Sequence, residues 1–541
     1  FLKLSDELNL LLERVYVYAH QRYHEDTANP TYQDLSNKAS ALAVQVGSAT
    51  AFATPEILSI PDEKIQQFMR ECEGLKLYEF YLQDILRMKP HILSAELEGL
   101  LASAGEVTDA PDNIYSMFNN ADIKFPEIQD ENGESVRITH GRFIKLLESS
   151  DRRVRKEAFE GLYNTYYSFR NTMAATYSAN VKQELFYTKA RKYNSNLERA
   201  LDANNIPVDV YTNLIEAVHK NMHLMYRYVK LRKKLLGLDE MHMYDLYTPL
   251  VQDIKMEIPY EEAKKIVEEG LQPLGEEYLS ILREGYNNRW IDVYENENKR
   301  SGAYSWGAYG THPYVLLNYN ETLSNVFTLA HEMGHAIHSY YSDKTQPYIY
   351  AGYKIFVAEV ASTCNEALLI DHLLKNTNDK KQKAYLINHF LEKFRGTLYR
   401  QTMFAEFEML THQMVEKGES LTAETLCKLY HDLNVLYFGD DIVIDPEIDM
   451  EWARIPHFYK AFYVYQYATG FSAAIAISRR ILEEGKPAVD DYVKFLSSGG
   501  SNYPIELLKI AGVDMSTTEP VNKALQLFSE LLDSMEELMK E

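Results

Sequence analysis

The residues best suited to chemistry form the pattern His331-Glu332-Met333-Gly334-His335. In a helix, a spacing of four residues places both imidazoles on one face, about one turn apart, so that both can reach one zinc ion. Glu332 would then lie beside the metal, where it can take a proton from water. Apolar neighbours favour a helix here, and Asn320 is the expected N-cap. The alternative is a polar helix face that binds no metal.

A catalytic zinc site also needs a third protein ligand and one open position. The strongest candidate is Glu359, within the small and apolar residues of 356–366. Glu366 follows two turns later on the same predicted helix face and could accept the second N–H of a ligand histidine. An ordinary surface pair of glutamates is the alternative. Cys364 lies between them and is expected to be a small buried hydrophobe.

Hydrogen-bond donors for an oxyanion are concentrated in residues 457–470. His457 comes first, and Tyr459, Tyr463 and Tyr467 follow at intervals of four residues, which predicts one tyrosine face on one helix. A tyrosine stripe at this spacing is more often packing than catalysis. Next to a zinc site, however, its hydroxyls could stabilise a transition state.

Most of the remaining sequence has the periodicity of amphipathic helices, as residues 8–18 and 524–538 illustrate. Two segments differ. Residues 122–139 alternate around a turn at 130–133, which predicts a β-hairpin. Residues 290–319 predict a small sheet immediately before the zinc helix, with a loop rich in glycine and aromatic residues at 301–310. Its last strand, within 314–319, is expected to offer an edge to an extended substrate.

The size and charge of the chain restrict its class. A length of 541 residues exceeds what one core supports, and we predict an N-terminal helical lobe (1–140, ending in the hairpin) and a catalytic domain (141–541). The net charge of −23 repels phosphate backbones, so no nucleic acid partner is expected. No apolar run is long enough for a membrane span. Three separated cysteines predict reduced thiols in a cytoplasmic protein. The oligomeric state stays open.

Taken together, these segments resemble oligoendopeptidase F, a group of the M3 (thimet oligopeptidase-like) zinc metallopeptidases. The matching stretches follow the order of the family across the C-terminal two-thirds of the chain: 331–338, the segment around Glu359, 399–408, 457–470 and 495–501. The resemblance implies a mainly α fold, in which a two-lobed helical body surrounds a deep substrate channel and a small β-sheet lies next to the zinc helix.

The resemblance also implies the roles of the residues around the metal. His331, His335 and Glu359 would bind one Zn²⁺ ion per chain. Glu332 would be the general base, and Glu366 would support the ligands from behind.

A second set of residues would face the scissile carbonyl. The resemblance assigns this role to His457, Tyr463 and Tyr467. Two departures from thimet-type relatives are present: the spacing from His457 to the first matched tyrosine is longer by one, and Gly470 replaces a further tyrosine. Tyr459 is therefore an alternative to one of the two assigned tyrosines.

The predicted activity is zinc-dependent endopeptidase cleavage of short oligopeptides. One alternative is a helical zinc carboxypeptidase, which also uses this histidine pattern and a later glutamate. Blocking the C-terminus of a peptide would stop a carboxypeptidase but not an endopeptidase. The other alternative is a binding or structural protein with a relict metal site. Such a protein would be expected to lack a ligand or the base, and here all four residues are present.

Overall fold

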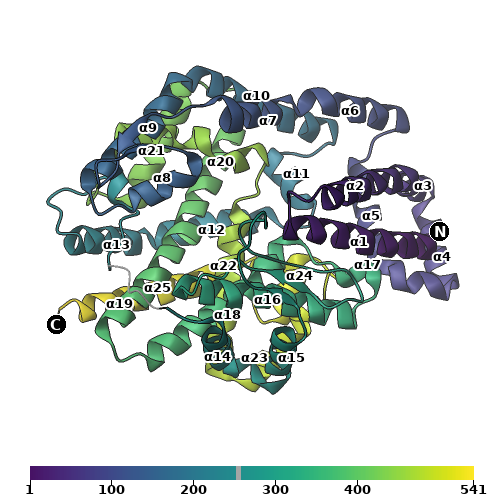
Figure 1. Cartoon of the computed structure of the whole chain (residues 1–541). Helices are drawn as coiled ribbons and strands as arrows, with labels where there is room; N and C mark the ends of the chain where they lie inside the picture. The colour runs from purple at the N-terminus through teal and green to yellow at the C-terminus, as the bar shows by residue number, and fades with distance from the viewer. Residues whose placement is uncertain (252–256, 541) are drawn as a thin grey trace. The chain divides into compact units, whose positions relative to one another are not determined.

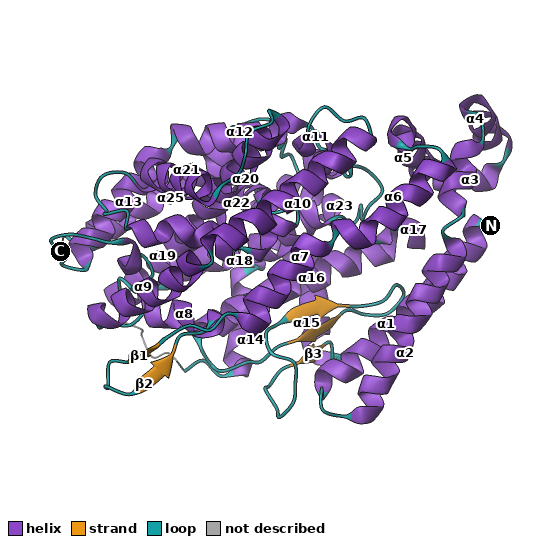
Figure 2. Ribbon diagram, turned by 90° about the horizontal axis from the view of Figure 1, so that it is seen from above, coloured by secondary structure: helices purple, strands orange, loops and turns teal. Residues whose placement is uncertain are grey.

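The computed structural model describes residues 1–251 and 257–540. The protein is mainly helical with two small sheets, as predicted (Figure 2). The chain divides into two compact units, each built from three segments. Unit 1 contains Phe1–Ile92, Lys255–Asn376 and Gly470–Met515, and unit 2 contains Leu93–Ile254, Thr377–Thr469 and Ser516–Glu541. None of these limits falls at residue 140, and the division at that residue stays a prediction, as does the substrate channel.

Unit 1 holds the first helices of the chain and the predicted zinc helix (Figure 1). Its α-helices are α1 (Leu2–Glu25), α2 (Pro30–Thr50), α3 (Ala53–Ser59), α4 (Asp62–Glu71), α5 (Glu79–Met88), α14 (Tyr260–Gly270), α15 (Gly275–Asn287), α16 (Leu323–Thr345), α17 (Tyr348–Ala351), α18 (Ile355–Asn376), α23 (Lys486–Leu496) and α24 (Pro504–Ile510). Short 3₁₀ helices are η1 (Glu73–Tyr78), η2 (Lys89–His91) and η5 (Gln272–Leu274). The helix α22 (Tyr465–Glu484) begins in unit 2 and continues into unit 1.

Unit 2 holds the remaining helices and the first two strands of the chain. Its α-helices are α6 (Ala95–Thr108), α7 (Ala110–Met117), α8 (His140–Leu147), α9 (Arg152–Ser168), α10 (Arg170–Ala190), α11 (Asn196–Asp202), α12 (Val208–Lys220), α13 (Met222–Leu235), α19 (Lys380–Lys393), α20 (Arg400–Glu416), α21 (Ala423–Phe438) and α25 (Glu519–Leu538). Its 3₁₀ and π-helices are η3 (Phe118–Asp122), η4 (Met243–Asp245), η6 (Phe394–Tyr399), η7 (Pro446–Arg454) and η8 (Pro456–Tyr459).

The predicted hairpin is confirmed in unit 2. The strands β1 (Glu127–Gln129) and β2 (Ser135–Arg137) pair antiparallel. The Asp130 carboxylate accepts the N–H groups of Asn132 and Glu134, and Gly133 has a φ of 82°. An aspartate that bonds its own turn and a glycine in the left-handed region are what such a turn requires.

The predicted sheet before the zinc helix is also present, but its strand order differs from the expectation. The order is β3 (Ile291–Asp292), β5 (Tyr314–Leu316), β4 (Tyr304–Trp306), so β5 is the central strand. It pairs parallel with β3 and antiparallel with β4. The prediction that residues 314–319 offer a free edge is therefore wrong. The reason is that residues 304–306, predicted as loop, form a strand that occupies this edge.

Helical periodicity predicted the terminal helices correctly but not the burial of the first one. Phe528 and Met535 of α25 are fully buried. In α1, by contrast, Leu11 and Tyr18 of the apolar stripe are each 62% exposed, and Val17 is buried instead. Within the described ranges, no helix is both long and apolar enough to cross a membrane.

Candidate functional site

Two helices of unit 1, α16 and α18, carry the predicted metal ligands and lie side by side (Figure 1). The N-cap of α16 is Thr322, whose hydroxyl accepts the N–H of Asn325. The prediction of Asn320 as the cap is therefore wrong, because Glu321, with a φ of 52°, still lies in the turn before the helix, which begins at Leu323. His331, Glu332 and His335 all lie within α16, as the spacing predicted.

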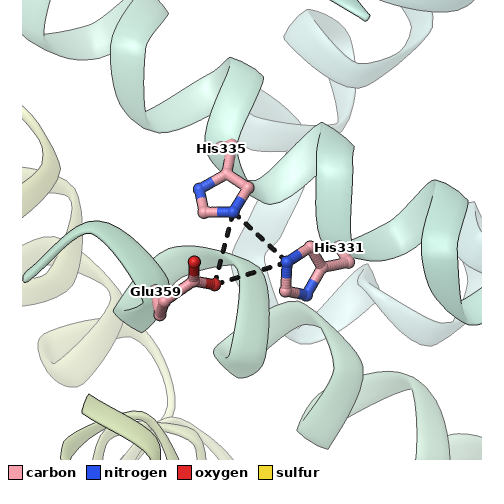
Figure 3. Close-up of side chains that lie close together, drawn as sticks. All are labelled: His331, His335 and Glu359. Carbon is pink, nitrogen blue, oxygen red and sulfur yellow. Dashed lines mark hydrogen bonds and ion pairs between the residues drawn. The ribbon is translucent and has the colours of Figure 1, made fainter. Parts of the chain in front are cut away.

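The side chains of His331, His335 and Glu359 point toward one another (Figure 3). The Nε2 atoms of the two histidines are 3.2 Å apart, and Glu359 Oε2 lies 3.3 Å from Nε2 of His331 and 3.4 Å from Nε2 of His335. Ligands about 2.0–2.1 Å from a tetrahedral zinc ion are separated by roughly 3.3 Å. The three atoms thus form a nearly equilateral triangle whose edges fit three of the four ligand positions around one tetrahedral zinc ion.

The charges of this group favour a cation at the same point. Burial acts against the protonated form of His331, but hydrogen bonds to Glu359 and Glu366 outweigh it and raise its pKa to about 10. Burial alone would raise the pKa of Glu359, whereas its hydrogen bonds to His331 and His335 hold that pKa well below the ordinary value. The two carboxylates therefore stabilise positive charge between the imidazoles.

Residues behind the ligands fix their orientation. Glu366, whose side chain is 7% exposed, accepts a hydrogen bond from His331 Nδ1 at 2.9 Å. This bond leaves Nε2 of His331 free to point at the ligand triangle. The Ser362 hydroxyl donates to Glu359 Oε2 at 3.0 Å. Glu366 was predicted from the sequence but Ser362 was not, and the only signal for it was its position one turn after Glu359.

Asn365 is a second residue that the sequence pattern did not reveal. Its side-chain amide donates to the carbonyl oxygen of Ala330 on α16 at 3.0 Å, and its Oδ1 accepts from the Tyr278 hydroxyl at 2.9 Å. Asn365 is fully buried. A buried asparagine within an otherwise apolar helix needs such partners, and here they tie α18 to the carbonyl that directly precedes His331.

The two other polar residues of the stretch 331–338, Glu332 and His338, are buried in different surroundings. Glu332 is 6% exposed. Burial raises its pKa, and the neighbouring His331 and His335 limit the rise. His338 stacks on Tyr353, with ring centroids 3.8 Å apart, and burial lowers its pKa to about 3. His338 is thus a neutral packing residue.

The predicted tyrosine stripe is not one helix face. Tyr459 ends the 3₁₀ helix η8, and α22 begins only at Tyr465, so Tyr463 lies in the turn between them. The prediction fails because Phe462 has a φ of 55°, which interrupts the helix. Tyr459 stacks on Tyr115 with centroids 4.3 Å apart.

His457, Tyr463 and Tyr467 nevertheless lie close together at this turn. These are the residues of unit 2 to which the resemblance assigns contact with the scissile carbonyl. The rings of His457 and Tyr463 are nearly parallel with centroids 5.8 Å apart. Tyr467 stands edge-on to both, at 6.1 Å from His457 and 5.5 Å from Tyr463. Burial, with the nearby charges of Lys460 and Arg400, lowers the pKa of His457. The neutral form of its imidazole, which can donate one N–H, is therefore favoured.

Comparisons with known proteins identify the family of this chain. The profile described as "Peptidase family M3" matches residues 145–527, and the profile described as "Oligopeptidase F" matches residues 56–125. Oligopeptidase PepF of Bacillus subtilis (strain 168) is 56% identical over 538 residues, which cover 99% of this chain and 80% of that protein.

Solved structures show the same fold. Oligoendopeptidase-F from Enterococcus faecium is 42% identical, with a TM-score of 0.78 over 98% of this chain and 91% of that one. A crystal structure of a candidate peptidase from Chlamydophila abortus is 39% identical and has a TM-score of 0.94, covering 99% and 90% of the two chains. The chain therefore belongs to peptidase family M3 and is a peptidase similar to oligoendopeptidase F.

Proposed function

We propose that this peptidase is a zinc-dependent endopeptidase that cleaves internal bonds of short oligopeptides. His331, His335 and Glu359 would hold the zinc ion, and Glu332 would be the general base. The observation that carries the proposal is the ligand triangle, with edges of 3.2–3.4 Å, next to a buried carboxylate. Two histidines and a glutamate with one open position are a donor set of catalytic zinc sites.

The chemistry divides between the metal and the residues of the chain. Zinc bound at this triangle would supply Lewis acidity, which activates water and polarises the peptide carbonyl. Glu332 would accept the proton of the attacking water and pass it to the leaving amine. Its burial suits this task, because a carboxylate with a raised pKa is a stronger base. Glu366 would keep His331 in the tautomer that presents Nε2.

His457, Tyr463 and Tyr467 are proposed as donors to the oxyanion of the tetrahedral intermediate. Their mutual ring contacts and the favoured neutral form of His457 support the assignment. Removing one such donor typically lowers kcat by about 10²–10³-fold. Tyr463→Phe and Tyr467→Phe should therefore reduce kcat with a smaller effect on KM, whereas Tyr459→Phe should not.

The first experiment uses an internally quenched peptide blocked at both ends. Enzyme stripped with a chelator should be inactive, and zinc should restore cleavage at an internal bond. Failure on the blocked peptide, with cleavage of one that has a free C-terminus, would indicate a carboxypeptidase. Failure on both, with zinc still bound, would indicate a protein that kept its metal site without the activity.

The second experiment tests the base. Glu332→Gln keeps the size of the side chain but cannot accept the proton, so kcat should fall by about 10²–10⁴-fold. The zinc content, measured by metal analysis, should stay at one ion per chain. Activity close to that of the wild type would refute the assignment of Glu332.

The cellular location is also proposed from the residues. The described cysteines, Cys72, Cys364 and Cys427, are all free thiols, and Cys364 is fully buried as predicted. Unpaired cysteines are usual where the environment is reducing, which supports the cytoplasm.

A further inference from the structure

A strained turn in unit 2 holds the proposed oxyanion donors together. Phe462 lies in this turn with a φ of 55°, in the left-handed region that bulky residues rarely adopt. It separates His457 from Tyr463 and Tyr467 in the sequence, and the rings of these three residues lie close together around this turn. Such a conformation persists only when surrounding groups enforce it.

The groups that enforce it come mainly from α20. Glu408 Oε1 accepts the N–H of Phe462 at 2.7 Å. His412, one turn later on the same helix, packs its ring against that of Phe462 with centroids 4.6 Å apart. The ring of Tyr211 also packs against the ring of Phe462, with centroids 5.7 Å apart. Both the backbone and the ring of Phe462 are therefore held by buried side chains.

Glu408 is an unusual residue to find in this place. It is 0% exposed, and its Oε2 has no hydrogen-bond partner in the described part of the chain. Burial raises its pKa well above the ordinary value, and the hydrogen bond from Phe462 offsets this only in part. Burial thus favours the uncharged form of the side chain, which uses one oxygen as an acceptor. A buried polar group left half-satisfied costs stability, so packing alone does not explain it.

We propose that Glu408 is a positioning residue for peptide hydrolysis. By accepting the Phe462 N–H, it fixes the turn that orients the imidazole of His457 and the hydroxyls of Tyr463 and Tyr467. This inference rests on the proposed function of those three side chains. The role requires a hydrogen-bond acceptor at this position but not a negative charge.

A matched pair of substitutions at Glu408 tests whether the position needs a hydrogen-bond acceptor and not a negative charge. Glu408→Gln keeps a carbonyl oxygen that can accept the Phe462 N–H, and Glu408→Met keeps the volume but offers no such acceptor. Glu408→Gln should retain kcat within about 3-fold. Glu408→Met should lower kcat by about 10–100-fold with KM changed less than about 3-fold, because the donors act mainly in the transition state. Zinc content should be unchanged in both.

Hydrogen exchange provides a readout that does not depend on activity. The segment 457–467 should exchange faster in Glu408→Met than in the wild type, and at the wild-type rate in Glu408→Gln. Glu406→Gln is the control for general effects on α20: Glu406 is also buried but accepts from Tyr437 and contacts His219 instead of the turn. It should leave kcat and exchange of 457–467 unchanged.

Three results would overturn the positioning role. They are a Glu408→Met enzyme with wild-type kcat, a loss that appears only in KM, and equal losses in Glu408→Gln and Glu408→Met. A wild-type enzyme that shows no zinc-dependent cleavage would instead refute the proposed function. In that case, unchanged exchange of 457–467 in Glu408→Met would still refute the structural part of the inference.

Discussion

At the scale of single residues, the candidate metal site combines carboxylates in two different states. Glu359 is held ionised by the histidines it contacts, while Glu332 is buried and its pKa is raised. Environment therefore assigns different tasks to two side chains of the same type, one suited to binding a cation and one suited to moving a proton. A third carboxylate, that of Glu366, accepts a hydrogen bond from Nδ1 of His331, the ring nitrogen that faces away from the ligand triangle.

The contribution of Glu366 can be measured as zinc affinity. Removing a carboxylate behind a ligand histidine typically weakens metal binding by about 10–100-fold. Glu366→Met should show such a loss in competition with a chromophoric chelator. Glu366→Gln, which still accepts the Nδ1 hydrogen bond, should lose less. Equal affinity of the wild type and Glu366→Met would contradict the role.

The carboxyl group of Asp343 should make the free energy of unfolding depend on pH. It lies on α16 and, with Glu13 of α1, lines a cavity of about 1130 Å³ in unit 1. Burial, together with the charge of Glu13, raises the pKa of Asp343 to about 7. The folded protein then keeps a proton that the unfolded chain releases near pH 4. The free energy of unfolding should therefore decrease as pH rises from about 4 to about 7 and then level off.

The substitution Asp343→Asn should remove this contribution. Relative to the wild type, the variant should gain stability as pH rises from 5 to 8, by an amount on the order of 1–2 kcal/mol because the carboxyl is only partly buried. Thermal unfolding of both proteins across this pH range measures the difference. A constant difference at every pH would mean that the Asp343 carboxyl does not titrate as described.

At the scale of elements, the centre exists because α16 and α18 approach each other very closely. A Cβ atom added at Gly334 would lie 2.6 Å from the Ser362 Cα and 2.8 Å from the Ala361 carbonyl oxygen. Asn365 bonds across the same contact. Glycine is required where the two helices cross, because the backbone of α16 lies directly against the backbone of α18. This close approach brings Glu359 within reach of both histidines.

Gly334→Ala should therefore separate the two helices. The expected cost is about 1–3 kcal/mol of stability from overpacking, accompanied by weaker zinc binding. Gly47→Ala in α2 of the same unit is the matched control, since its added Cβ meets no atom within 4 Å. It should be neutral or stabilise the protein by up to about 1 kcal/mol. Unfolding and zinc titration of both variants would test whether the close packing at Gly334 positions the zinc ligands. Unchanged zinc affinity in Gly334→Ala would contradict this.

At the scale of the whole molecule, the proposed zinc ion links two helices of one unit. All three ligands belong to unit 1, so zinc should stabilise that unit directly. A ligand at 100 times its Kd adds about 2.7 kcal/mol to the free energy of unfolding. Zinc should therefore slow hydrogen exchange in α16 and α18 more than in α9 and α10 of unit 2. His335→Ala should abolish the effect, and equal protection of all four helices would argue against a site confined to unit 1.

Features set by neighbouring residues could be read from the sequence by itself. A spacing of four residues determines that His331 and His335 share a helix face, and a spacing of seven does the same for Glu359 and Glu366, because the helical repeat is a local property of the backbone. The hairpin at 127–137 followed from its turn residues for the same reason. The resemblance to family M3 depended on the order of such local motifs.

Features set by contacts between distant segments were decided only by the tertiary structure. Strand β4 forms because β5 offers it a partner, and this made β5 central instead of an edge. The turn at Phe462 overrides the helical spacing of the tyrosines because Glu408 and His412, about fifty residues earlier, hold it. Likewise, the distance from Glu359 to the histidines depends on how closely two helices pack at Gly334, which no local periodicity specifies.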